Sequence, residues 1–88
     1  FDVRRPQKIQ SRINGELRQD STTDLMIFHV PYVIAELSQG MTLRPGTIIS
    51  MGTPAGVGMG FDPPEWLHPG DVVACSIEGI GTLTNTVR

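Results

Sequence analysis

The sequence has 88 residues, a formal net charge of −2, and seven Lys and Arg residues against nine Asp and Glu. A chain of this length makes one small domain with a thin core, and its weak acidic charge offers no basic surface for nucleic acid. No apolar run approaches the roughly 18–20 residues of a membrane-spanning helix, so we expect no nucleic-acid or membrane partner and a soluble, cytoplasmic protein. The first residue is Phe1 rather than Met, which predicts a processed product or a piece of a longer protein.

The first predicted element is a β-hairpin over residues 8–19. Apolar and polar residues alternate before the dipeptide Asn14-Gly15, and an alternating pattern resumes after it. Asn-Gly between two such runs is the strongest short hairpin signal, because both residues tolerate the positive φ angles of a type I′ turn. A polar loop, residues 20–24, follows the hairpin.

One helix is predicted after this loop. Pro31 suits the first turn of a helix, and Gly40 is placed to end it. Between them the apolar residues recur every three or four positions, which predicts one stripe that faces the core. The stripe consists of Val30, Ile34, Leu37 and Met41.

Three further strands are predicted in the second half of the chain, over residues 47–51, 72–78 and 82–87. Cys75, the one cysteine, lies within the alternating pattern of the second of these strands, so we expect a small buried side chain rather than a reactive thiol. Five short strands and one helix make a mainly β domain.

The segment "MGTPAGVGMG", residues 51–60, is named the glycine loop here. A phosphate-binding loop would end in Gly-Lys-Ser/Thr and open a helix, whereas the glycine loop runs into Pro63-Pro64. Two interpretations stay open. The loop is a sharp corner of the β structure, or its exposed backbone and the stiff hydroxyl of Thr53 form a site for a carboxylate.

Residues that carry acid-base or metal chemistry are scattered through the sequence. No two carboxylates have metal-ligand spacing on one element, so the sequence predicts no metal site built from this chain alone. His29 and His68 lie far apart, and we interpret each as a packing or surface residue. The sequence therefore identifies no catalytic residue.

Several motifs taken in order resemble the carboxy-terminal part of the fumarylacetoacetate hydrolase family. They are "INGELRQDSTTDLMIFHVPYVIAELSQGMTLRPGTIISMGTPAGVG", residues 13–58, followed by "PPEWLHPGDVVACSIEGIGTLTNTV", residues 63–87. The resemblance covers nearly the whole chain. The pair Pro63-Pro64 after the glycine loop is similar to the branch with ureidoglycolate-lyase-like and domain-containing-protein-2-like members.

The resemblance implies a mixed β-roll enzyme, usually a homodimer, that binds Mg²⁺ or Mn²⁺ and acts on 2-oxo acids or diketo acids. The reactions of such enzymes break or rearrange bonds beside a polarised carbonyl through an enolate, by carbon–carbon hydrolysis, decarboxylation or isomerisation. In the family the threonine of the G-T-P sequence contacts the substrate carboxylate. Carried onto this chain, the substrate-binding residues are Gly52, Thr53 and Pro54.

The resemblance also implies that residues 1–88 are the carboxy-terminal part of a catalytic domain. The metal ligands of the family, a Glu-x-Glu pair and a later Asp, lie upstream of the hairpin and are not found in this chain. We therefore expect a fragment of a metal-dependent enzyme that is inactive in isolation. The alternative is a stand-alone, non-catalytic β domain that serves binding or oligomerisation.

Overall fold

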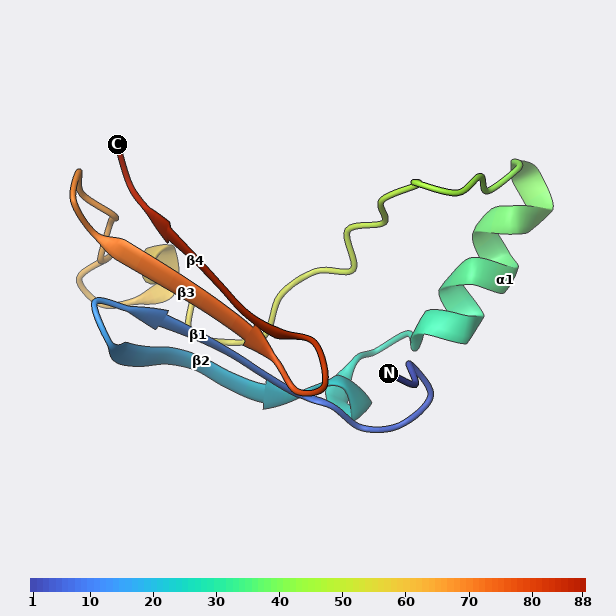
Figure 1. Ribbon diagram of the computed structural model, residues 1–88, viewed down its shortest axis with the longest axis horizontal. Helices are drawn as coiled ribbons and strands as arrows, with labels where there is room; N and C mark the ends of the chain where they lie inside the picture. Colours follow the sequence, from blue (N-terminus) through green and yellow to red (C-terminus); the bar gives the residue numbers. More distant parts are fainter.

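The computed structural model describes residues 1–88, and its central feature is one antiparallel sheet of four strands in the order β2-β1-β3-β4 (Figure 1). The strands are β1 (Lys8–Ile13), β2 (Glu16–Thr22), β3 (Val72–Ile77) and β4 (Gly81–Thr86). Strand β1 pairs with β2 on one side and with β3 on the other, so the first hairpin and the last hairpin form one sheet. The prediction of a mainly β fold with one helix is confirmed.

The turn of the first hairpin has the conformation that the sequence predicts. Asn14 and Gly15 have φ angles of 51° and 82°, the left-handed values that a type I′ turn requires. Strand β2 runs three residues beyond the predicted end, to Thr22. The ladder between β1 and β2 also contains a β-bulge, because Ser11 pairs with Gln19 whereas Arg12 pairs with Leu17, which leaves Arg18 without an opposite residue.

Side-chain contacts tie this turn to the one that precedes β3. The amide nitrogen of Asn14 donates to Oδ1 of Asp71 at 3.0 Å, and the other oxygen of Asp71 accepts the backbone N–H of His68 at 2.8 Å. The side-chain oxygen of Asn14 in turn accepts the N–H of Val72 at 2.9 Å. The His68 N–H, followed by the Asn14 amide, holds the pKa of Asp71 below its usual range.

The single helix, α1 (Val30–Gly40), has Pro31 in its first turn and ends at Gly40, as predicted. Figure 1 shows α1 at one end of the molecule and the sheet at the other, joined by an extended segment, and the chain measures 41 × 26 × 25 Å along its principal axes. Two short 3₁₀ helices, η1 (Thr23–Leu25) and η2 (Gly58–Gly60), complete the regular structure. No helix in this chain has the length and apolar character needed to cross a bilayer.

The predicted strand over residues 47–51 is wrong, and the sheet has four strands rather than five within the chain. These residues belong to the extended segment after α1 and pair with no strand. Ile48 is 93% exposed. Three β-branched residues give this segment the propensity for a strand, but a strand also needs a neighbour that completes its hydrogen bonds.

No residue of the chain is buried, which overturns two predictions about the core. The stripe of α1 does not face a core, since Ile34 and Met41 are 44% and 58% exposed. Cys75 lies in β3 as predicted, but it is exposed rather than buried. Both predictions fail for one physical reason: no other element of these 88 residues covers the helix stripe or the exposed part of the sheet around Cys75.

Candidate functional site

The glycine loop, residues 51–60, lies against β2 and is held there by the side chain of Gln19. The Gln19 amide nitrogen Nε2 donates to the hydroxyl oxygen of Thr53 at 2.7 Å and to the carbonyl oxygen of Pro54 at 2.9 Å. The amide oxygen of Gln19 accepts a hydrogen bond from the hydroxyl of Ser11 at 2.9 Å. All the hydrogen-bonding groups of this side chain except one acceptor site on its oxygen are thus used, and they connect β1, β2 and the loop.

Arg18, next to Gln19 at the bulge, forms the second connection between β2 and the segment that follows the loop. Its guanidinium lies 2.6 Å from a carboxylate oxygen of Glu65 and 5.0 Å from the ring centre of Phe61. A bulge turns consecutive side chains toward the same side of a strand. Arg18 and Gln19 can therefore both reach the glycine loop or the residues that follow it.

The charge of Arg18 is already balanced by carboxylates. Besides Glu65, Glu16 lies 3.5 Å from Nε of Arg18, but this contact lacks hydrogen-bond geometry and the buried Nε has no hydrogen-bond partner. We interpret the Glu16 contact as an ion pair alone, and because Glu16 is largely exposed its contribution is small. Arg18 is therefore a structural residue rather than a free cation for a ligand.

Two glycines of the loop lie so close to neighbouring backbone that a side chain has no room. A methyl group at Gly56, whose φ is +109°, would come within 3.0 Å of the Arg18 carbonyl oxygen. A methyl group at Gly58 would overlap the carbonyl oxygen of Glu65 in the same way. The glycines at these two positions are thus required by close backbone contact, which is one part of what the glycine loop is for.

The exposed part of the loop offers hydrogen-bond donors. Within residues 1–88 the backbone N–H groups of Gly52, Thr53 and Ala55 have no acceptor, and Pro54 between them has no N–H. Thr53 is exposed, and its hydroxyl accepts from Gln19. The three residues predicted to bind substrate, Gly52, Thr53 and Pro54, are consecutive, and they present a hydroxyl and bare amides, the groups that bind a carboxylate.

The carboxylates and histidines of the chain do not assemble into a metal centre. No group of three or more His, Cys, Asp or Glu side chains lies close enough together to hold an ion. Of the acidic residues near the sheet, Glu65 pairs with Arg18 and Asp71 with Asn14. The donor set of this chain therefore does not fit Mg²⁺ or Mn²⁺.

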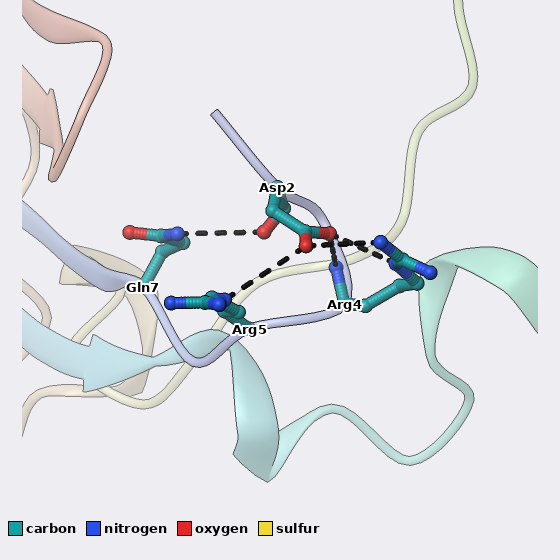
Figure 2. Close-up of polar contacts among 4 residues, drawn as sticks. All are labelled: Asp2, Arg4, Arg5 and Gln7. Carbon is teal, nitrogen blue, oxygen red and sulfur yellow. Dashed lines mark hydrogen bonds and ion pairs between the residues drawn. The ribbon is translucent and has the colours of Figure 1, made fainter.

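A second polar cluster lies at the start of the chain (Figure 2). The Asp2 carboxylate accepts two hydrogen bonds from the Arg4 guanidinium, at 3.1 and 3.2 Å, and one from the Arg4 backbone N–H. The side-chain bonds, more than the backbone bond, hold the pKa of Asp2 below its usual range. Arg5 lies 3.9 Å from the same carboxylate. Arg4 and Arg5 border a surface hollow of about 70 Å³; Asp2 pairs with both but its single charge offsets only one of theirs, and because both guanidinium groups are largely exposed to water their attraction for an anion is weak.

Two surface hollows of the chain lie away from the glycine loop. The first is the hollow beside Arg4, and the second, near the end of β3, is bordered by Lys8, Glu78 and Thr82 among others. Because Gly52, Thr53 and Ala55 are exposed, the loop forms one wall of a site within residues 1–88 rather than a closed pocket. A wall of this kind needs an opposite wall before it can exclude water from a ligand.

Sequence reasoning missed the connection between Gln19 and Thr53. The one signal that pointed to it is the sequence N-G-E-x-x-Q, in which Gln19 is the last residue. The spacing of 34 residues between the partners and the bulge that aims Gln19 cannot be read from local patterns.

The family model described as "Fumarylacetoacetate (FAA) hydrolase C-terminal" matches residues 2–88. Together with the antiparallel sheet and the threonine-bearing loop, this match defines the class of protein. The chain belongs to the fumarylacetoacetate hydrolase family. The fold predicted from the resemblance is confirmed by its structural neighbours, whereas the narrower branch suggested by Pro63-Pro64 stays a prediction.

Individual relatives agree with this assignment. Oxaloacetate tautomerase YisK of Bacillus subtilis is 51% identical over 80 residues, which are 91% of this chain and 27% of that protein. The solved fumarylacetoacetate hydrolase of the psychrophile Exiguobacterium antarcticum is 50% identical with a TM-score of 0.94, covering 100% of this chain and 31% of that one. The 2-hydroxyhepta-2,4-diene-1,7-dioate isomerase of Mycobacterium marinum is 42% identical with a TM-score of 0.84, covering 99% and 31%. The chain thus spans about three tenths of the length of these relatives.

Proposed function

We propose that residues 1–88 are the carboxy-terminal part of the catalytic domain of an enzyme that acts on 2-oxo acids or diketo acids. In this proposal Gly52, Thr53 and Pro54 bind the substrate carboxylate. The observation that carries the proposal is the presentation of the Thr53 hydroxyl beside unpaired backbone amides on an anchored loop. Preorganised donors of this kind bind a carboxylate without having to reorganise.

The reaction class rests on the names of the relatives. One is called a tautomerase of oxaloacetate and another an isomerase of an unsaturated dioate. Tautomerisation and isomerisation of an oxo acid move a proton beside a carbonyl through an enol or enolate, as do decarboxylation and carbon–carbon hydrolysis in related chemistry. A third relative is called a fumarylacetoacetate hydrolase, so we assign this chain an enolate reaction on an oxo acid without a choice among tautomerisation, isomerisation and hydrolysis.

The role of this chain in that reaction is to bind and orient. The loop fixes the carboxylate end of the substrate and so sets where the carbonyl beside it lies. A divalent ion, Mg²⁺ or Mn²⁺, would polarise that carbonyl when bound. Its ligands would come from outside residues 1–88, because no group of His, Cys, Asp or Glu side chains in this chain could hold it. The remaining parts of the proposal are a cytoplasmic location and a homodimer.

The test is Thr53→Val in the full-length polypeptide that we propose contains this chain. Valine keeps the shape and the β-branching but removes one hydrogen bond to a charged group, a loss of about 1.5–3 kcal/mol of binding. We expect KM, and the inhibition constant of oxalate, to rise about ten- to a hundredfold, with a modest fall in the melting temperature from the lost Gln19–Thr53 hydrogen bond.

Thr84→Val is the matched control. Thr84 is exposed on β4 and makes no side-chain hydrogen bond within the chain, so the same chemical change there leaves KM and the inhibition constant unaltered. An unchanged KM and an unchanged oxalate constant in Thr53→Val would contradict the proposal. That result would favour the alternative, a non-catalytic domain in which the loop is a structural corner.

A further inference from the structure

We propose that Gln19 is a positioning residue that occupies one lone pair of the Thr53 hydroxyl and keeps its proton free for a ligand, so that the glycine loop favours a ligand oxygen that only accepts hydrogen bonds. The inference rests on the proposed function, because it concerns the same carboxylate site. It adds a residue from β2, and it gives a physical reason why the loop prefers a carboxylate to a carboxamide.

The first step is the orientation of the Gln19 amide, which its surroundings determine. The carbonyl oxygen of Pro54 can only accept, so the group 2.9 Å from it must be the Gln19 nitrogen. The hydroxyl of Ser11 satisfies the amide oxygen on the other side, as a donor at 2.9 Å. The reverse orientation would place two oxygens that only accept against each other at Pro54.

The second step follows from the chemistry of an amide nitrogen, which donates and never accepts. Thr53 Oγ1 lies 2.7 Å from this nitrogen, and it must therefore be the acceptor in that bond. The hydroxyl proton of Thr53 then points elsewhere, and no group within residues 1–88 accepts it. The bond from Gln19 thus restricts the rotation of the hydroxyl and directs its proton away from Gln19, where a ligand oxygen can accept it.

The third step is selectivity. A ligand at the loop meets the Thr53 hydroxyl proton and the N–H groups of Gly52, Thr53 and Ala55, which are all donors. A carboxylate satisfies them with both of its oxygens. A carboxamide presents its NH₂ group to one of these donors, which leaves donors facing each other without an acceptor.

The support for Gln19 is itself built into the sheet. Gln19 is half-buried at the bulge of β2, opposite Ser11 of β1, and both of its neighbours in the network lie on separate elements. A side chain held at both ends of its amide has little freedom to turn. Its position is thus fixed by the fold before a ligand arrives.

The test is Gln19→Glu in the full-length polypeptide, with oxalate as the probe. Glutamate has the same size, but its carboxylate accepts only, so it takes the Thr53 proton and turns the hydroxyl inward. At pH 8 we expect the inhibition constant of oxalate to rise about tenfold or more, in line with the loss of one charge-assisted bond. Gln39→Glu, the same substitution on the exposed surface of α1, is the control and leaves the constant unchanged.

The pH profile separates positioning from a merely structural role. Protonation of the new carboxyl restores a donor toward Thr53, so the ratio of variant to wild-type constants falls toward one as the pH is lowered from 8 to below the ordinary pKa of Glu, about 4.3. A ratio that stays constant with pH would overturn the inference.

Two further variants distinguish the possible failures. If Thr53→Val weakens oxalate binding but Gln19→Glu matches wild type at every pH, the positioning role is wrong and the proposed function stands. If Thr53→Val does not change oxalate binding, both the positioning role and the proposed function are wrong. Because the new carboxylate of Gln19→Glu also repels oxalate directly, Gln19→Met, which removes the donor without adding charge, is measured beside it. An oxalate constant within about twofold of wild type in Gln19→Met would overturn the inference.

Discussion

Replacing Gly56 by alanine tests whether the glycine loop is built on close backbone contact. Gly56 has a φ of +109°, and an added methyl would lie 2.9 Å from the Arg18 carbonyl carbon and closer still to its oxygen. The left-handed conformation costs a residue with a Cβ about 1–2 kcal/mol. Forcing an extra methyl against backbone adds about 1–3 kcal/mol, because backbone cannot move aside as a flexible side chain can.

Three other glycines separate these two costs. Gly70 has a φ of +93° and open space, so Gly70→Ala carries the conformational cost alone. Gly58 has no positive φ but would meet the Glu65 carbonyl, so Gly58→Ala carries the steric cost alone. Gly60 has neither a positive φ nor a close backbone contact, since a methyl there would lie an ordinary 3.6 Å from Val57. Gly60→Ala therefore leaves stability nearly unchanged.

The assay is denaturant unfolding of the full-length polypeptide, with the oxalate constant measured on the same samples. We expect Gly56→Ala to lower the free energy of unfolding by about 2–5 kcal/mol, more than either single-cost variant, and to weaken oxalate binding as the loop moves off Gln19. If Gly56→Ala costs no more than Gly70→Ala, the loop does not approach β2 as described and the reasoning is refuted.

Three further predictions concern pH, stability and metal. The lowered pKa of Asp71 means that its carboxylate stabilises the folded state above the unfolded pKa, near 3.8, and that this stabilisation is lost as the pH falls through the folded value. Thermal unfolding should therefore show the melting temperatures of wild type and Asp71→Asn converging as the pH drops below about 4, and a gap that stays constant would contradict this. Because no residue is buried, the isolated 88-residue chain should unfold without a sharp transition, and reversible, cooperative, concentration-independent melting would favour a self-sufficient module. Calorimetric titration of the isolated chain with Mg²⁺ should give no saturable heat, and a stoichiometric site below millimolar would show that its ligands lie within these residues.

Local signals in the sequence predicted the local structure well. The Asn14-Gly15 turn, the start of α1 near Pro31 and its end at Gly40 all appear where the residues indicate. Each depends on the backbone preference of one or two residues, which acts without help from distant parts of the chain. The family motifs likewise identified the family and its fold.

The predictions that failed are those that needed a distant partner. Ile48 and its neighbours have the propensity for a strand but no strand to pair with, and the apolar stripe of α1 has no surface to cover it. Cys75 sits in the predicted strand on an exposed part of the sheet. Propensity and periodicity describe what a segment prefers, whereas burial depends on what packs against it.

The candidate site also combines a residue that a local motif identifies with a contact that depends on distant parts of the chain. Thr53 was found from the G-T-P sequence, but its connection to Gln19 depends on a bulge and on the placement of the extended segment, neither of which has a local signature. The sequence thus located the loop, and the structure supplied the hydrogen-bonding state of its hydroxyl.

A crystal structure of the full-length polypeptide with oxalate tests the central claim most directly. We predict an oxalate oxygen about 2.5–2.7 Å from Thr53 Oγ1, with the Gln19 nitrogen still donating to the same hydroxyl and a backbone N–H of residues 52–55 directed at the ligand. Oxalate bound elsewhere, with the Thr53 hydroxyl turned to another acceptor in the protein, would contradict it.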